Sequence, residues 1–265
     1  MAIDHKLISS FVSEMQFSYS ESESISLEQH FSVYEKFLRQ LGYDGATYSF
    51  VPKIQIEVMK DLPAIFLSTS AYPIGFIEQY TAERLDQNDF TVRKILAGEM
   101  IPMDWREHEI NGWVSEIEAN VIKLARDKYG IKNAISIPML YEEKGLAGAS
   151  VISYLNDDAF NKLKEKTLDS LLSITRLFHV RISSEEDLTY KFILPVLKNL
   201  SEKEITILSY KASGKLMVNI EDETGISSSF AANLLSRLRK RLGGINTERL
   251  MYLMGLLNTI GTIQR

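Results

Sequence analysis

The last third of the chain carries the pattern that most constrains the fold. From Leu200 onward, three short segments with helical apolar spacing are separated by Gly214 and Gly225, and the third ends in a basic cluster. Ser201 and Glu204 have the spacing of a capping box, which opens a helix, and glycine favours the left-handed conformation that ends one. The pattern predicts short helices joined by a tight turn, which is the arrangement of a helix-turn-helix.

The third segment is expected to form a two-sided helix from about Ser228 to Leu242, with Ser227 as its N-cap. A recognition helix needs one side for the core and one for phosphates and base edges. The inward side is expected to comprise Phe230, Ala231, Leu234, Leu235, Leu238 and Leu242. The DNA contacts are expected from Ser228, Ser229, Asn233, Arg237, Lys240 and Arg241. Ile205, Leu208 and Ala212 are expected on one face of the first helix, and a short second helix is expected to contain Val218, Ile220 and Thr224. A fourth helix is expected around 248–257. The alternative is a small helical bundle with solvated charges.

Charge is unevenly distributed along the chain. The 265 residues carry a net charge of −5. The part from residue 197 onward has ten Lys and Arg against six Asp and Glu, a net +4, and the remainder has a net −9. A basic C-terminal part behind an acidic one favours contact with double-stranded DNA through one end only.

Composition excludes several kinds of site. The chain has no cysteine, which excludes disulfides and thiolate metal sites and fits a cytoplasmic protein. No apolar run approaches the ~18–20 residues that span a bilayer, and no signal peptide is visible, so no membrane partner is expected. The four histidines lack metal-ligand spacing, and Glu107, His108 and Glu109 are expected to form an exposed turn. We expect no catalytic centre, no metal, no cofactor and therefore no enzyme.

The first 182 residues show mixed helix and strand patterns. Helical spacing is expected at 27–41 and 113–129, which Gly42 and Gly130 are expected to end, and at 72–85 and 157–182. A further short segment is expected at 92–97. Strands are expected at 46–52, 135–140 and 148–154, and 64–70 is either a strand or a loop. We therefore expect an α+β chain: an N-terminal α/β/α sandwich with an antiparallel sheet over 1–182, a linker over 183–199, and an all-α, four-helix helix-turn-helix domain over 200–265. Short antiparallel strands flanked by helices are typical of small-molecule sensors.

Aromatic side chains are concentrated in one part of this N-terminal domain. Tyr72, Phe76 and Tyr80 follow one another at intervals of four, which places them on one stripe of a helix, and Trp105 follows later. Such a stripe is more often plain core than a pocket. Asp89 bears on the choice, because an acid among apolar neighbours must be hydrogen-bonded or is costly to bury. It either belongs to a binding site or caps the following turn.

The C-terminal motifs resemble a known family. Glu204, Leu208 and Gly214 are followed by GIS at 225–227 and a basic helix that ends in RKRLG, and this spacing resembles the DNA-binding module of the LuxR family of bacterial quorum-sensing regulators. The family usually has Thr-Val where this chain has Phe-Ala at 230–231. Such departures keep the fold but reduce the polar face of the helix.

The N-terminal motifs are similar to the same family's ligand-binding half. YPIGFIEQY, NDFTV and MDW supply Tyr72, Tyr80, Asp89 and Trp105 at matching places. The resemblance implies that the Asp accepts the amide N–H of an acyl-homoserine lactone and that the tyrosines close on the acyl carbonyl and chain. Ligand contacts are expected from Thr47, Ser49, Tyr72, Phe76, Tyr80, Asp89, Thr91, Trp105 and Ser136.

This chain departs from the resemblance where the lactone would bind. Phe76 replaces the tryptophan that donates to the lactone carbonyl, and phenylalanine has no N–H. Phe90 replaces a proline, Ala134 a glycine, and Val151 stands where a hydroxyl residue is common. Each hydrogen bond lost to a buried ligand group costs about 1–3 kcal/mol. Ordinary acyl-homoserine lactones are therefore expected to be poor ligands, and the retained Asp89 favours another small amphiphilic signal molecule with a donor group.

These observations predict a homodimeric transcriptional regulator that senses a small molecule and binds DNA. Dimer contacts are expected from 168–182 and 250–257. One alternative is a ligand-independent regulator of the same type, whose pocket is filled by Phe76 and Phe90. Another is an interaction protein that heterodimerises with a second regulator and inhibits it.

Overall fold

The structure is a computed structural model that describes residues 3–17, 26–142, 145–183, 191–192, 195 and 199–256. The chain divides into two compact units. Unit 1 comprises Met1–Phe50, Pro63–Tyr141 and Leu146–Leu188, and unit 2 comprises Val51–Leu62, Glu142–Gly145 and Thr189–Arg265. Most of the linker expected at 183–199, the turn residues 143–144 and the stretch 257–265 lie outside the described residues.

A five-stranded sheet with the strand order β2-β1-β5-β4-β3 lies at the centre of unit 1. The strands are β1 (Gly45–Pro52), β2 (Leu67–Ser68), β3 (Met103–Asp104), β4 (Asn133–Glu142) and β5 (Gly145–Ser153). β1 pairs antiparallel with β2, and β3 pairs antiparallel with β4. The three strands predicted from alternation are present, and the segment 64–70 contributes only the two residues of β2.

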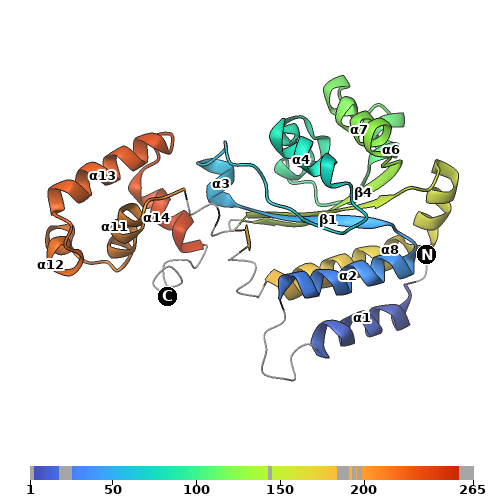
Figure 1. Ribbon diagram of the computed structural model, residues 1–265, viewed down its shortest axis with the longest axis horizontal. Coiled ribbons are helices and arrows are strands. Elements are labelled where there is room, and N and C mark those ends of the chain that lie inside the picture. The colour runs from blue at the N-terminus through green and yellow to red at the C-terminus, as the bar shows by residue number, and fades with distance from the viewer. Residues whose placement is uncertain are drawn as a thin grey trace. The chain divides into compact units, whose positions relative to one another are not determined.

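Helices cover both faces of this sheet (Figure 1). One face is covered by α2 (Leu27–Leu41) and α8 (Asp157–Ser183), and α1 (His5–Phe17) packs on these two helices. The other face is covered by α4 (Ile74–Ala82), α6 (Trp105–Ile110) and α7 (Glu116–Tyr129). Two shorter helical segments, η1 (Leu85–Asn88) and α5 (Phe90–Leu96), lie between α4 and α6 in the sequence. The predicted α/β sandwich with an antiparallel sheet is confirmed for the N-terminal part.

Strand alternation divides β1 between two cores. Tyr48 points to the α2–α8 side, where its hydroxyl lies 3.0 Å from Nδ1 of His179 and its ring packs edge-on against Phe178. Thr47 points to the opposite side, where its hydroxyl hydrogen-bonds the phenol of Tyr72. The functional residues discussed below lie on this second side.

The helix boundaries of unit 1 follow local capping chemistry. Ser26 caps α2 and Ser115 caps α7, each in a capping box, and Gly42 and Gly130 end these helices with φ of 99° and 73°. Both glycine stops were predicted. The start of α7 was placed too early, at residue 113, because the cap at Ser115 and not the apolar pattern decides where the helix begins.

Unit 2 consists mainly of C-terminal helices around a small apolar cluster. They are α11 (Glu202–Ala212), η3 (Met217–Asn219), α12 (Ile220–Thr224), α13 (Ser228–Arg241) and α14 (Thr247–Leu256), and α3 (Lys53–Glu57) belongs to the same unit. The cluster is formed by Ile207, Tyr210, Ile220 and Ala231. None of the helices within the described residues is long and apolar enough to cross a membrane.

Three expectations for unit 2 need correction. Val218 is 71% exposed, since it lies in the 3-10 turn η3 and not in α12. Ala212 is exposed, because α11 turns Ile207 and Tyr210 inward instead. Phe230 is 38% exposed, whereas Ala231, Leu238 and Leu242 are buried as expected.

Candidate functional site

The predicted aromatic stripe is part of a buried cluster in unit 1. Tyr72 precedes α4, and Phe76 and Tyr80 lie on it, with ring centroids 6.3 Å and 5.9 Å apart along the series. Two aromatic residues that the sequence patterns did not indicate join them. Phe66 lies edge-on to Tyr80 at 5.8 Å, and Tyr129 lies edge-on to Phe76 at 5.4 Å. Aromatic rings from outside α4 therefore pack against the stripe.

Asp89 lies beside this cluster, and its carboxylate accepts hydrogen bonds from Tyr80, from Thr91 and from the backbone of Val92. The phenol of Tyr80 donates to Oδ2 at 2.9 Å, and the backbone N–H and hydroxyl of Thr91 donate to Oδ1 at 2.8 and 2.7 Å. Asp89 is also the N-cap of α5. The side chain therefore caps the following helix, as one of the two sequence interpretations predicted, and it also lies beside the aromatic cluster. Burial raises the pKa of the Asp89 carboxyl, and the bonds from Thr91 and Tyr80 oppose that rise.

Trp105 begins a second polar chain in the same core. Its indole N–H donates to the hydroxyl of Ser136 at 2.9 Å, and that hydroxyl lies 2.7 Å from the hydroxyl of Ser150. The sequence pattern did not indicate Ser150, and the comparison with the family pointed to its neighbour Val151 instead. Adjacent residues on a strand point to opposite faces, so the hydroxyl on the site side of β5 is supplied by Ser150.

The other residues that the sequence singled out on this side of the sheet are Ser49, a predicted contact, and Phe90 and Ala134, which depart from the family pattern. Ser49 donates to the carbonyl of Ile65 at 2.7 Å. Phe90 is buried against the ring of His108, 4.9 Å away, and Ala134 is fully buried. The structure thus brings Tyr72, Phe76, Tyr80, Phe90, Trp105 and Ala134 into one cluster, with the polar residues Thr47, Asp89, Thr91 and Ser136 bonded to each other or to its members.

The groups of this cluster are of the kinds that bind a small amphiphile. The Asp89 carboxylate has about four acceptor positions and already accepts from Tyr80, Thr91 and the backbone of Val92, so a ligand donor would have to displace or share one of these bonds. The aromatic rings supply apolar surface for an alkyl chain, and burial raises the pKa of the Tyr72 and Tyr80 phenols, which therefore remain neutral. A neutral amphiphile with one hydrogen-bond donor matches these groups.

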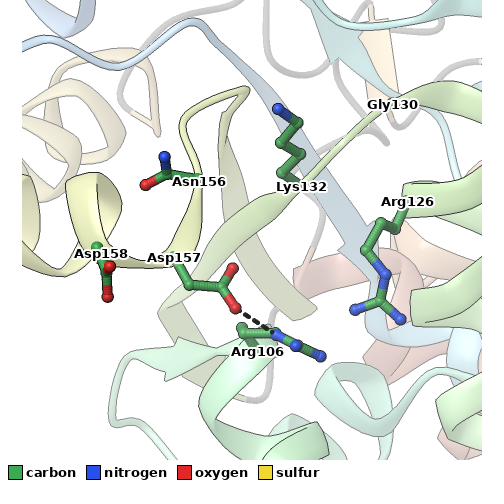
Figure 2. A pocket seen from close by; sticks show the side chains of 7 residues that line it. All are labelled: Arg106, Arg126, Gly130, Lys132, Asn156, Asp157 and Asp158. Carbon is green, nitrogen blue, oxygen red and sulfur yellow. Dashed lines mark hydrogen bonds and ion pairs between the residues drawn. The ribbon is translucent and has the colours of Figure 1, made fainter.

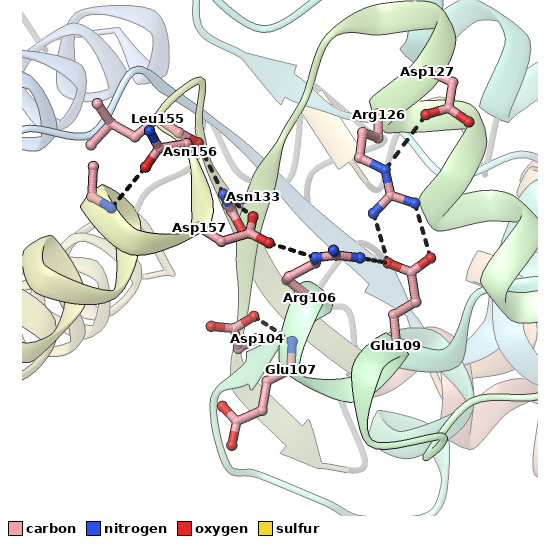
Figure 3. Close-up of polar contacts among 11 residues, drawn as sticks. Asp104, Arg106, Glu107, Glu109, Arg126, Asp127, Asn133, Leu155, Asn156 and Asp157 are labelled. Carbon is pink, nitrogen blue, oxygen red and sulfur yellow. Dashed lines mark hydrogen bonds and ion pairs between the residues drawn. The ribbon is translucent and has the colours of Figure 1, made fainter.

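A separate network of charged residues ties α6, α7 and α8 together (Figure 3). Oε1 and Oε2 of Glu109 accept from the guanidinium of Arg126 at 2.9 and 2.7 Å, and Arg106 bridges Glu109 to Asp157 at 2.8 and 2.9 Å. The guanidinium of Arg126 holds the pKa of Glu109 at about 2. The expectation of an exposed turn at 107–109 was wrong, because His108 is buried and Glu109 is held by two arginines.

The same residues border a surface pocket of about 630 Å³. Its lining comprises Arg106, Arg126, Gly130, Lys132, Asn156, Asp157 and Asp158 (Figure 2). Because both guanidiniums are already bound to carboxylates of the chain, these side chains act chiefly as ties between elements.

The polar side of α13 carries the residues predicted to contact DNA. Ser229, Asn233, Arg237 and Lys240 are exposed, and Ser228 is half-buried. Arg241 is exposed as well, yet its guanidinium lies 3.1 Å from Oε2 of the buried Glu204. Ser227 caps the helix by accepting the N–H of Phe230 at 3.4 Å, as predicted. Of the two residues expected to contact phosphate, Arg241 is therefore bound to a carboxylate of the chain, and Lys240 is exposed on the helix surface.

Comparisons with known proteins place the N-terminal part in a family. Residues 26–182 match the family model described as autoinducer binding domain. No curated protein matches the sequence significantly. A crystal structure of SdiA from Escherichia coli is 15% identical, with 96% of this chain and 98% of that chain covered and a TM-score of 0.48.

Two further solved structures resemble the chain. SdiA in complex with octanoyl-rac-glycerol is 15% identical, with 98% of each chain covered and a TM-score of 0.46. CepR2 from Burkholderia cenocepacia, described as an N-acylhomoserine lactone dependent LuxR family transcription factor, is 11% identical, with 73% of this chain and 96% of that chain covered and a TM-score of 0.46. The family match alone covers more than half of the sequence, so the chain belongs to the autoinducer binding domain family, as its resemblance to LuxR-type regulators predicted.

Proposed function

We propose that this protein is a homodimeric, DNA-binding transcriptional regulator whose N-terminal domain senses a small amphiphile other than an ordinary acyl-homoserine lactone. The observation that carries the proposal is Asp89, a carboxylate held by Tyr80 and Thr91 beside an aromatic cluster within the matched family region. Keeping a carboxylate in such surroundings is costly, and a ligand donor would offset part of that cost.

The hydrogen-bond inventory argues against a lactone head group. Phe76 has no donor, and the N–H of Trp105 is already given to Ser136. A lactone carbonyl would therefore lack the donors that it needs when buried. SdiA has been solved with octanoyl-rac-glycerol. An acylglycerol hydroxyl is a donor of the kind that Asp89 can accept, so this ligand class belongs in the test for this chain.

One observation favours a ligand-independent regulator as the second candidate. The polar groups of Tyr80, Asp89, Thr91, Trp105 and Ser136 all find partners within the chain. A sensor that needs its ligand to complete the core is expected to leave such groups unpaired without it. The two candidates differ in whether any small amphiphile stabilises the folded protein.

Thermal unfolding of the full chain with N-octanoyl homoserine lactone and with 1-octanoylglycerol tests the sensor proposal. A ligand of the native state at a hundredfold excess over its dissociation constant adds about 2.7 kcal/mol of stability. We expect stabilisation by the acylglycerol and little by the lactone. The reverse order would refute the proposed ligand class, and stabilisation by neither would favour the ligand-independent candidate.

Three variants sharpen this test. Phe76→Trp restores an indole donor and is expected to improve lactone affinity by about one to two decades. Asp89→Asn leaves one neutral amide oxygen in place of two carboxylate oxygens and is expected to weaken stabilisation by the acylglycerol. Lys162→Ala, an exposed residue on α8, is the matched control and should respond like the unchanged protein.

The DNA-binding part of the proposal is supported by the two-sided character of α13. Its inward side packs through Ala231 and Leu238, and its outward side exposes Asn233, Arg237 and Lys240. Binding of labelled random-sequence duplex to the full chain, measured against salt concentration, tests it. Phosphate contacts make the affinity fall steeply with salt, and we expect Lys240→Ala to reduce that slope by about one per subunit, or about two for the dimer. Absence of duplex binding would favour the heterodimerising interaction protein.

Dimerisation is supported by exposed apolar residues on the last turns of α8. Val180 is 65% exposed and Leu177 is 36% exposed, within the segment 168–182 that was expected to form dimer contacts. Apolar side chains on the outside of a helix favour contact with another chain.

A further inference from the structure

Phe230 is an apolar side chain on the otherwise polar surface of α13. It is 38% exposed and does not belong to the apolar cluster of unit 2. At 100° per residue, Ala231 and Leu238 define the buried side of the helix, and Phe230 falls at one edge of the opposite side, close in angle to Arg237. The ring therefore borders the surface that carries the basic residues.

The position of the ring is restrained by two neighbours. The ammonium of Lys203, on α11, lies 5.2 Å from the ring centroid, a favourable cation–π distance. The backbone N–H of Phe230 donates to the capping hydroxyl of Ser227. An exposed phenylalanine is thus held in the first turn of a capped helix beside a positive charge.

The residues around Phe230 on the outward side are short. Ser229, Ala232, Asn233 and Ser236 are all exposed, and none has a side chain long enough to keep a partner at a distance. The long basic side chains begin with Arg237. A helix of this kind can approach its partner closely through its first half while its second half neutralises negative charge.

Charge complementarity and size point to one occupant, the major groove of double-stranded DNA. The groove admits an α-helix, and its apolar feature on base-pair edges is the C5-methyl group of thymine, which apolar side chains contact. We propose that Phe230 contacts a thymine C5-methyl group, so that each half-site of the operator requires a thymine at one position. The inference rests on the proposed DNA-binding function and deepens it.

Replacing thymine by deoxyuridine tests this contact, because it removes the methyl group and leaves the hydrogen-bonding edge unchanged. Sites are first selected by the full-length protein from a random duplex library, and each thymine is then replaced singly. We expect one position in each half-site at which deoxyuridine weakens binding by about fourfold, the factor for one buried methyl group. At that position Phe230→Ala should bind thymine and deoxyuridine equally well.

Two further variants distinguish the contact from a general loss of binding. Phe230→Leu keeps an apolar side chain and should keep part of the discrimination. Lys240→Ala should weaken binding to thymine and deoxyuridine sites alike. Thermal unfolding checks that each variant is folded, which is expected because residue 230 is largely outside the core.

The outcomes separate this inference from the function on which it rests. If the unchanged protein binds duplexes but tolerates deoxyuridine everywhere, or if Phe230→Ala still discriminates, the methyl contact is wrong and DNA binding stands. If no salt-dependent binding to any duplex is found, the proposed function and this inference fall together. A protein partner that binds through Phe230 instead would belong to that second outcome.

Discussion

At the scale of single residues, Asp89 shows how one side chain serves a local and a tertiary purpose. It caps α5 through the N–H of Thr91, a contact two residues away, and it accepts the phenol of Tyr80 from α4. Burial nevertheless raises its pKa above the ordinary value of 3.8. The carboxylate is therefore retained at a cost in stability, which is characteristic of functional positions.

This cost can be measured through its pH dependence. Because the pKa of Asp89 is raised, the folded state binds the proton more tightly than the unfolded state, and the contribution to stability falls as pH rises through the window above 3.8. Asp89→Asn removes this titration. We expect the free energy of unfolding of the unchanged protein, relative to the Asn variant, to decrease between pH 4 and pH 7 in urea denaturation. A difference that stays constant over this range would contradict the assignment.

Gly45 offers a second test at this scale. A Cβ atom there would lie 2.5 Å from Oγ1 of Thr69, the atom that accepts the N–H of Ala46 at 3.0 Å. We expect Gly45→Ala to destabilise the protein by about 1–3 kcal/mol, measured by urea denaturation. Gly148→Ala is the control, since its Cβ would meet its nearest neighbour at an ordinary 3.5 Å and should cost less.

At the scale of elements, the charged network of Figure 3 decides how α6, α7 and α8 are held. Glu109 is only 12% exposed and accepts from Arg106 and Arg126. Salt bridges at the surface contribute little to the free energy of unfolding. A carboxylate that is shielded from water and accepts hydrogen bonds from two guanidiniums contributes more, because hydrogen bonds between charged groups are stronger. Its pKa of about 2, lowered from 4.5, reflects that environment.

Replacing this carboxylate tests the network. We expect Glu109→Gln to lower the free energy of unfolding by about 2 kcal/mol at pH 7. Since the folded pKa is lowered, the contribution is present above pH 4.5 and is lost as pH falls towards 2. The difference between variant and unchanged protein should therefore shrink on acidification. Asp127→Asn is the control, because Asp127 is 72% exposed and lies 3.5 Å from Arg126, so little change is expected.

At the scale of the whole molecule, the proposal requires two copies of the chain. Val180 lies on the exposed side of α8 near its end, 65% exposed, and an apolar residue buried in an interface cannot be replaced by a charge without a large cost. We expect Val180→Asp to weaken dimerisation by at least about tenfold, measured by sedimentation equilibrium.

The control for this measurement is another exposed apolar residue of the same unit. Ile74 on α4 is 62% exposed and lies on the opposite side of the sheet from α8 (Figure 1). Ile74→Asp should leave dimerisation unchanged. Equal effects of the two substitutions would argue against α8 as the interface, and a monomeric unchanged protein would refute the dimer.

The features that could be predicted from the sequence alone are the helix ends, because these depend on residues close together in the chain. The capping box of Ser201 and Glu204 and the glycine stops at 42, 130 and 214 are present as predicted. A cap or a positive φ depends on residues within one turn, so it can be recognised without knowing the fold. The family resemblance likewise rests on residues read in order along the chain.

What only the tertiary structure decided is which side chains meet. Glu109 was expected in an exposed turn and lies between two arginines. Ser150, and not its neighbour, supplies the hydroxyl beside Ser136. Phe230 was expected inside and is exposed on α13. Burial and partners depend on the register of strands and the packing of helices from distant parts of the chain, whereas helix ends depend on the local sequence, and this physical difference separates what could be predicted from what could not.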